Sequence, residues 1–499
     1  MTTAAEPAPG HSDRRDWLVA GLAAVGLLAL FVAVQRGEVT TYDSKIAVAT
    51  AKAIVQGHLH LDPADDVYGR HLPYSHFGIG MPLVILPLYV LQQAFHAPPE
   101  VLVTLASPLL LAGSGAVLYL SGRELGWSRR LSLAGALVFG TLTMALQISQ
   151  DLFSEPGVAF ATALLVLGLL RWRTGRPSGP WLVGLGTAVG VLFRTDSILL
   201  LGVGLLLLPA FVPWRRLLGQ PWAWVSLMLP IVAAVAWTGW YSMIRDGTPI
   251  PQVYGGSFRT PLLQGLDGLL LSHGKSLFVF NPFLVLAIPG AVALWRRDRA
   301  LTVLVLVLVA ARALFFARWS AWYGGVAWGP RLLMPVVGPL SLLAVYALSR
   351  IPRLPVALRI LAAIGVAGLV VVSAGVSLAS VWVWQGASWK WLTYRPPGLE
   401  GQALGQFKAE RRTGYYDSLE NNAIAYNLRH MGQQNPSFPL RYFRGGSTLV
   451  GVVALAMASL VPLVAWLVAG RGQAGASTRG RPVTTRPAST ATYAGPPGH

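Results

Sequence analysis

Apolar stretches long enough to cross a bilayer recur along nearly the whole sequence. About 30 Å of hydrocarbon requires roughly 17 to 25 residues of α-helix. The 499 residues are 54% hydrophobic and 12% charged, with a mean hydropathy of +0.54, so a soluble fold would have too few polar side chains to cover its surface. The sequence therefore predicts an all-α polytopic membrane protein.

Arginine clusters lie in the short loops between the apolar stretches, where the positive-inside rule places the cytoplasm. Seven such clusters predict about twelve spanning helices in the plasma (inner) membrane, with both termini cytoplasmic. This pattern also accounts for the net charge of +19, and no aromatic-interleaved basic patch accompanies it. We therefore expect no nucleic-acid partner. The clusters are Arg14/Arg15, Arg123/Arg129/Arg130, Arg171/Arg173/Arg176, Arg215/Arg216, Arg296/Arg297/Arg299, Arg350/Arg353/Arg359 and Arg471/Arg479/Arg481/Arg486.

The remaining loops are predicted to face outward. They are Gln35 to Pro99, Gln150 to Pro156, Arg194 to Ser197, Tyr241 to Phe280, Arg318 to Arg331 and Trp384 to Ser447. Residues 78–95 are apolar but contain Gly80, Pro82 and Pro87, so we expect a re-entrant or interfacial element there. The organisation is thus a cytoplasmic N-terminus (1–16), a transmembrane module (17–348) with outer loop 35–99, a C-terminal transmembrane region (349–470) with outer loop 384–447, and a disordered cytoplasmic tail (471–499).

Asp43 is the leading candidate for chemistry in the first outward loop. It opens a pattern with one apolar face, typical of a helix that lies along the membrane surface. An Asp at the start of a helix is also a good N-cap, and the two roles are compatible. Asp43 is therefore predicted to cap this helix, to act as a catalytic carboxylate, or both.

A second acidic pair, Asp151 and Glu155, lies at the outer end of a predicted span. The two residues are four apart, so they share one face if the segment is helical. Glu155 is alternatively only a polar boundary residue before Pro156, which suits the first turn of a helix.

Cations and aromatic residues occur in other outward segments. The candidates for binding an anionic substrate are His76, Lys275, Arg318 and Arg331, and Tyr74 adds an aromatic hydroxyl. Arg194, Asp196 and Arg312 fall within or near apolar helices, where charges are costly unless they pair or bind a ligand. Arg194 with Asp196 is alternatively a simple ion pair at a tight turn.

The first outward loop also contains residue types that can bind a metal ion. The loop holds His58, His60, His71 and His76 together with Asp62, Asp65 and Asp66, and the chain has no cysteine. No HExxH, EF-hand or CxxC spacing is present, so solvated loop residues are the favoured interpretation. We assign no metal ligand and no certain cofactor, and leave a divalent metal open.

Five motifs together resemble those of a known family. They are TYDS (41–44), YSHFGIGMPLVILP from Tyr74, QDLFSEP from Gln150, GKSLFVFNP from Gly274 and WSAWYGGVAWGPRLLMP from Trp319. The pattern resembles the polyprenyl-phosphate-dependent membrane glycosyltransferases of the GT-C type, namely the protein mannosyltransferase and aminoarabinose transferase branch (glycosyltransferase families 39 and 83). The resemblance implies a GT-C-like bundle, with 17–348 as its catalytic module.

The resemblance also implies that Asp43 is the base and that Asp151 or Glu155 is a second acid near the site. A departure is that Ser44, rather than a second acid, follows Asp43. The expected function is transfer of a hexose or pentose, with inversion, from a polyprenyl-phosphate donor to a glycan, lipid or protein acceptor of the cell envelope, on the outer face and in contact with membrane lipid. His76, Lys275 and Arg331 are expected to bind phosphate, and Tyr74, Arg194 and Arg318 are further candidates for substrate binding. The alternative is a multi-pass transporter or a lipid-linked sugar flippase.

Overall fold

The computed structural model describes residues 13–65, 73–98, 100–250, 257–325, 327–383, 400, 402, 422–431 and 448–470. These residues form helices and connecting loops with no strand, which confirms the predicted all-α class. The α-helices are α1 (Arg14–Ala33), α2 (Tyr42–Val55), α3 (Gly80–Ala94), α4 (Ala106–Glu124), α5 (Arg129–Thr141), α6 (Ala145–Ile148), α7 (Glu155–Arg173), α8 (Ser178–Phe193), α9 (Ile198–Phe211), α10 (Trp214–Gly219), α11 (Pro221–Asp246), α12 (Leu262–Leu270), α13 (Leu277–Phe280), α14 (Ala287–Trp295), α15 (Arg299–Arg318), α16 (Met334–Leu348), α17 (Val356–Trp382), α20 (Ala423–His430) and α22 (Thr448–Gly470). Short 3-10 turns are η1 (Pro63–Asp65), η2 (Val103–Leu105), η3 (Thr195–Ser197), η4 (Pro282–Leu286), η5 (Arg331–Leu333) and η6 (Ile351–Arg353).

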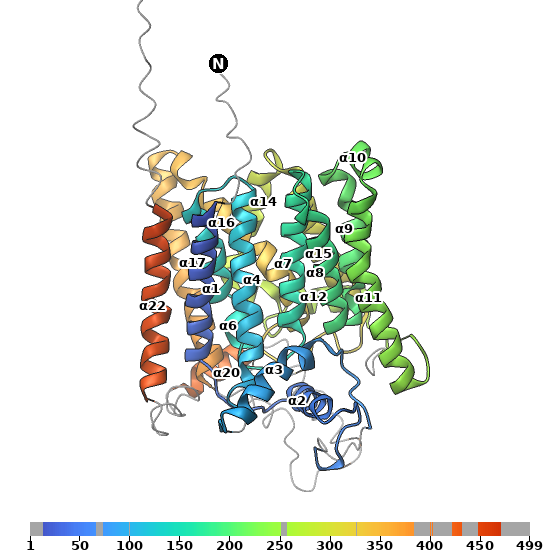
Figure 1. The fold of residues 1–499 in the computed structure, drawn as a ribbon. Helices are drawn as coiled ribbons and strands as arrows, with labels where there is room; N and C mark the ends of the chain where they lie inside the picture. The colour runs from blue at the N-terminus through green and yellow to red at the C-terminus, as the bar shows by residue number, and fades with distance from the viewer. Residues whose placement is uncertain are drawn as a thin grey trace, which may run out of the picture.

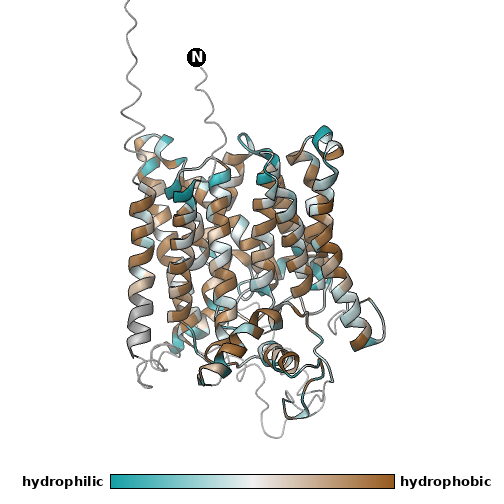
Figure 2. Cartoon of the chain, viewed as in Figure 1, coloured by the Kyte–Doolittle hydropathy of each residue, from teal (hydrophilic) through white to brown (hydrophobic). Residues whose placement is uncertain are grey.

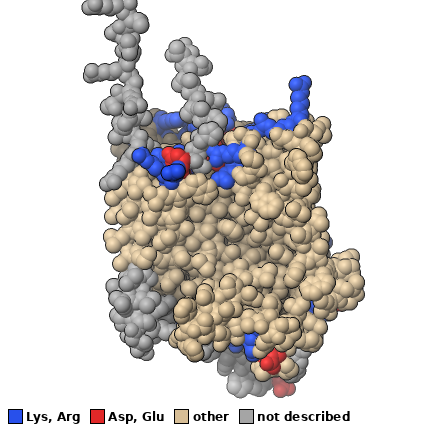
Figure 3. All heavy atoms as spheres, in the orientation of Figure 1, with Lys and Arg blue, Asp and Glu red and all other residues tan. Residues whose placement is uncertain are grey.

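The long helices stand side by side as a bundle with two different ends (Figure 1). The basic end, defined by the start of α1 at Arg14 and the last turn of α7 at Arg173, gathers most of the Lys and Arg visible in Figure 3. The opposite end, where α1 ends at Ala33 and α7 begins at Glu155, is called the site end. The predicted alternation of basic and other loops therefore corresponds to the two ends of the bundle.

Seven of the described helical segments are long and apolar enough to cross a membrane. Five shorter apolar segments lie among or beside them, so the number of about twelve spans stays a prediction. Figure 2 shows apolar residues along the flanks of the bundle and polar residues gathered toward its ends. The seven segments are Arg14–Ala33, Val103–Glu124, Glu155–Arg173, Pro221–Asp246, Arg299–Arg318, Arg331–Arg353 and Val356–Trp382, and the five shorter ones are Gly80–Ala94, Ser178–Phe193, Thr195–Phe211, Pro282–Trp295 and Ala456–Gly470.

Helix α7 lies at the centre of the bundle, and nearly all of its residues are buried. Its neighbour α8 approaches closely because glycines line the contact. A methyl group added to Gly168 would lie 2.6 Å from the backbone nitrogen of Val183, and one on Gly186 would lie 2.7 Å from the carbonyl oxygen of Ala161. This packing holds Glu155, at the start of α7, beside the last turn of α8.

Helices α2 and α3 lie across the site end rather than within the bundle (Figure 1). Helix α3 occupies the segment 78–95, for which a re-entrant or interfacial element is predicted, and Pro87 lies inside it. Gly78 fixes the start of this segment against α8, since a methyl group there would lie 2.5 Å from the carbonyl oxygens of Leu192 and Phe193. The depth of α3 in a membrane stays a prediction.

Several predicted regions lie wholly or mostly outside the described residues. They are the N-terminus before residue 13, most of the outer loop 384–447, and the tail 471–499. The predicted boundaries at residues 16, 348 and 470 therefore stay predictions.

Candidate active site

Asp43 lies in the first turn of α2, where its carboxylate does not serve as the N-cap. The cap is Thr41, whose Oγ1 accepts a hydrogen bond from the backbone N–H of Ser44 at 3.4 Å. The expectation that Asp43 caps the helix was therefore wrong, because the preceding Thr satisfies the free backbone donor first. The carboxylate still lies at the positive end of the helix dipole and is available for other partners.

Arg331, at the start of η5, is the partner of Asp43. Its NH1 donates to Asp43 Oδ2 at 2.9 Å, joining residues 288 positions apart in the chain. The guanidinium carbon of Arg331 lies 4.3 Å from the centre of the Phe153 ring, which fixes its orientation by a cation–π contact. The side chains of Asp43 and Arg331 are 24% and 16% exposed, so the pair is partly exposed.

Glu155 lies behind this pair, at the first position of α7. Its Oε1 is 3.1 Å from NH1 of Arg194 and 3.8 Å from Nε of Arg331, and the side chain is 1% exposed. Its Oε2 is buried and has no hydrogen-bond partner among the residues that the structure describes. Glu155 is therefore held by two cations and keeps one free acceptor atom.

Two more charges extend this network into the bundle. Arg194 Nε donates to Asp196 Oδ1 at 2.8 Å, and NH2 of Arg312 reaches Asp196 Oδ2 at 3.4 Å. The pairing of Arg194 with Asp196 is thus confirmed, but the two residues are not an isolated pair. Acids and arginines alternate along one chain of contacts, which we call the charge ladder: Asp43, Arg331, Glu155, Arg194, Asp196 and Arg312.

Asp151 lies near enough to the charge ladder for the charges of Arg331 and Asp43 to act on it, but its hydrogen bonds are made to other residues. It lies between α6 and α7, where its carboxylate accepts from Gln147 Nε2 at 3.3 Å and its carbonyl from Ser107 Oγ at 2.6 Å. Burial raises the pKa of the Asp151 carboxyl above its ordinary value, although the positive charge of Arg36 opposes this shift. Asp151 lies in the non-helical segment between Ile148 and Glu155, so the helical arrangement under which the two acids would share a face is not formed.

Lys275 is buried and holds the loop that leads to Arg331. Its ammonium donates to the carbonyls of Gly325 (3.0 Å), Ala327 and Gly329 (3.2 Å). Both glycines have positive φ angles, so this loop needs residues without a side chain. Burial lowers the pKa of Lys275 well below its ordinary value. Its role in binding phosphate stays a prediction, and its visible contacts position the loop.

Tyr74 and Arg318 are not part of the charge ladder. The Tyr74 ring packs against His60 with ring centres 4.4 Å apart, and Arg318 donates to the carbonyl of Phe258 at 3.2 Å. His76 lies nearer, because its ring stacks on that of Tyr42, the neighbour of Asp43, at 5.6 Å.

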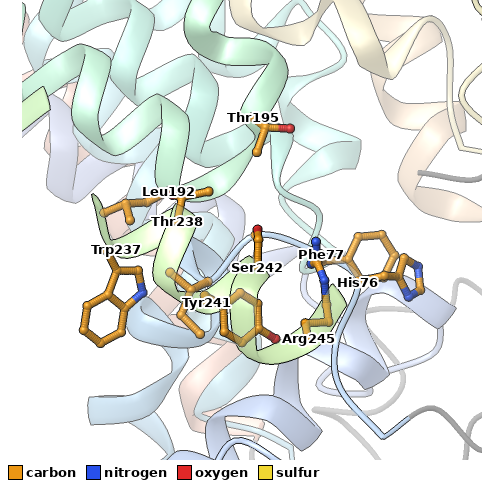
Figure 4. A pocket seen from close by; sticks show the side chains of 11 residues that line it. His76, Phe77, Leu192, Thr195, Trp237, Thr238, Tyr241, Ser242 and Arg245 are labelled. Atoms are coloured by element: carbon orange, nitrogen blue, oxygen red, sulfur yellow. The ribbon is translucent and has the colours of Figure 1, made fainter. Parts of the chain in front are cut away.

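A cavity beside His76 adds residues that sequence analysis missed. Figure 4 shows Tyr241, Ser242 and Arg245 from α11 near His76 and Phe77 from the loop before α3. Thr195 of η3 also lines this cavity, between two members of the charge ladder. Ser242 Oγ is buried without a hydrogen-bond partner among the described residues. In the sequence, Arg245 is a typical basic residue at a helix C-terminus, so only the fold reveals its place here.

Among the described residues, no group of three or more His, Asp or Glu side chains is arranged to hold a metal ion. His71 and Asp66, which belong to the metal hypothesis, lie outside the described residues. The possibility of a divalent metal therefore stays open.

Comparison with known proteins gives a match only in structure. No family model matches the sequence, and no curated protein matches it either. ArnT from Cupriavidus metallidurans bound to undecaprenyl phosphate is similar, with a TM-score of 0.51 and 16% identity over 93% of this chain and 80% of ArnT.

Two further solved structures are similar to this chain. ArnT in the apo state gives the same TM-score and identity over 92% of this chain and 79% of ArnT. The oligosaccharyltransferase AglB from Archaeoglobus fulgidus, in complex with an inhibitory peptide and a dolichol-phosphate, has a TM-score of 0.47 and 13% identity over 79% of this chain and 59% of AglB. The likeness to ArnT shows that this chain has the GT-C fold that its motifs predicted.

Proposed function

We propose that this chain is an integral membrane glycosyltransferase that moves one hexose or pentose from a polyprenyl-phosphate donor to a glycan, lipid or protein acceptor of the cell envelope. The carrying observation is the partly open pair of Asp43 and Arg331 at the site end, in a chain with the fold of ArnT. ArnT has been crystallised bound to undecaprenyl phosphate, which supports a donor of that class.

Asp43 is the proposed general base. The acceptor oxygen attacks the anomeric carbon, the bond from that carbon to the phosphate oxygen breaks, and the acceptor's proton passes to the Asp43 carboxylate. A single displacement of this kind inverts the anomeric centre. The phosphate leaves as an anion without needing an acid, which distinguishes this site from the two-carboxylate sites of glycosidases.

Arg331 orients Asp43 and offers positive charge to the departing phosphate. The cavity lined by His76, Thr195, Ser242 and Arg245 supplies further donors, so we propose that these residues and Arg331 together bind the donor phosphate. Glu155, which is 1% exposed and lies behind the partly open pair, is proposed to help position the sugar through its contact with Arg331. Asp151, which is buried beside Gln147, is proposed to support the same part of the site.

The proposed location of this reaction is the outer face of the plasma membrane. The site end is opposite the basic end, and basic loops favour the cytoplasm. A polyprenyl donor keeps its chain in the bilayer and its phosphate at the interface, which matches a site where the surface helix α2 meets the ends of the bundle helices.

The test is reconstitution of the purified chain in liposomes with a panel of undecaprenyl-phosphate-linked hexoses and pentoses and an envelope fraction as acceptor. We expect at least one donor to release undecaprenyl phosphate while its sugar becomes attached to the acceptor fraction. Passage of intact donor across the bilayer, without release of undecaprenyl phosphate, would instead support a flippase and contradict the proposal.

A further inference from the structure

Arg312 is a buried charge in the middle of an apolar helix. It belongs to α15, which is long and apolar enough to span a membrane, and it is 1% exposed. A charged arginine within a membrane span costs free energy unless its guanidinium is paired, and such residues often serve a function. Arg312 does not itself contact the side chains of Asp43 and Arg331. Its contacts are therefore informative.

The guanidinium of Arg312 contacts two separate turns that carry the site. Its Nε donates to the carbonyl of Leu332 at 3.1 Å, in the η5 turn that begins with Arg331. Its NH2 reaches Asp196 at 3.4 Å, in the η3 turn that follows Arg194. Arg194, immediately before η3, and Arg331, the first residue of η5, are the two arginines that flank Glu155.

An aromatic ring joins Arg312 to Arg194, one of these two arginines. The guanidinium carbons of Arg312 and Arg194 lie 5.0 and 5.7 Å from the centre of the Phe316 ring, one turn further along α15. A planar guanidinium can stack on a ring and donate in two directions, which the ammonium of a lysine cannot do. The position of Arg312 is thus defined from three sides.

We infer that Arg312 is a positioning residue, which holds the η3 and η5 turns in a fixed relative position so that Arg331 orients the Asp43 carboxylate toward the acceptor. This inference rests on the proposed function for its role in catalysis, but the coupling of Arg312 to Asp43 is a physical property that stands apart from it. Arg312 acts by two routes: through the backbone next to Arg331, and through Asp196, Arg194 and Glu155.

A matched control is available at the other end of the bundle. Arg171 of α7 is also buried, and its Nε donates to Glu124 at 3.1 Å near the basic end. Replacing Arg171 removes a buried ion pair of similar kind without touching the η3 or η5 turn. It separates a general loss of stability from an effect on the site.

The first measurement uses the thermal unfolding of the full chain in detergent, followed by tryptophan fluorescence. We compare Arg312→Met, Asp43→Asn and their combination with the same set built on Arg171→Met. We expect the Tm losses of Arg312→Met and Asp43→Asn to combine non-additively, and those of Arg171→Met and Asp43→Asn to add. Additive losses in the Arg312 set would overturn the inference, whether or not the chain transfers sugar.

The second measurement uses the transfer assay with a donor that proves active. Arg312→Met should lower kcat on the order of 100-fold with little change in the donor KM, while Arg171→Met keeps the wild-type kcat. Arg312→Lys, which keeps the charge and serves if the Met variant does not fold, should recover only part of this kcat because it cannot hold both turns. Wild-type kcat in the Lys or Met variant would overturn the role of Arg312 and leave the proposed function standing. A wild-type chain that transfers no sugar would contradict the proposed function alone.

Discussion

At the scale of single residues, the site depends on which acids are paired and which are buried. Asp43 is paired with Arg331 and partly exposed, whereas Asp151 is buried beside Gln147. Both are outward-loop acids in the sequence and differ only through tertiary contacts. The sequence indicated that Asp43 was a candidate, but it could not show that Thr41 would take the capping role or that Arg331 would be the partner.

The raised pKa of Asp151 leads to a prediction about stability and pH. Because its pKa is higher in the folded chain than in the unfolded chain, the folded state binds more protons between the two values, and stability falls as pH rises through that range. Asp151→Asn removes this ionisation. We expect the Tm of the wild type to fall relative to that of Asp151→Asn as pH rises from about 4 toward neutral. A constant difference between the two Tm values across this range would contradict the assigned burial.

At the scale of helices, the site lies where α2, the start of α7, the end of α8 and the η5 turn bring their charged residues together, and α3 packs against α8. Gly80 lies under the ring of Phe193, the last residue of α8, and Gly157 of α7 faces the same ring. The sequence predicted an interfacial element over 78–95 from its prolines and glycines. It could not predict that these glycines would pack against α8, because nothing local specifies a partner so distant in the chain.

Gly80→Ala tests this packing. The added methyl would lie 2.4 Å from the Phe193 ring, so α3 or the ring must move, and we expect the neighbouring residues Ile79 and Leu192, which line the cavity beside His76, to shift with them. We expect a lower Tm and weaker stabilisation of the chain by added undecaprenyl phosphate, both read from thermal unfolding. The matched control is Gly21→Ala in α1, where a methyl group meets nothing within 4 Å, and which should leave both readings unchanged or raise the Tm slightly. Equal behaviour of the two variants would contradict the packing described here.

At the scale of the whole molecule, the bundle has a basic end and a site end. The all-α class, and the assignment of loops to the basic end or the site end, were predictable. The length of an apolar segment and the positions of arginines can both be read from the local sequence. The alternating contacts of Glu155, Arg194, Asp196 and Arg312 were not, because they join four helices or turns. Residue types indicated only that such buried charges would need partners.

The proposed orientation can be tested directly because the chain has no cysteine. A single cysteine at Asp62, in the loop after α2, is expected to react with a membrane-impermeant maleimide added to intact cells. A single cysteine at Arg353, at the basic end, should react only after the membrane is permeabilised. Labelling in the reverse order would place the site on the cytoplasmic side and contradict the proposed location.

The most direct test of the central claim compares two acids near α2. Asp43→Asn removes the proposed base while keeping the size of the side chain, and Asp65→Asn removes an acid of the same loop that pairs with Lys52 at 2.9 Å. In the reconstituted transfer assay, with matched expression and at a temperature well below the Tm of each variant, Asp43→Asn is predicted to lower kcat by about 100-fold or more, as loss of a general base does, and Asp65→Asn to retain wild-type activity. Full activity of Asp43→Asn would contradict the account.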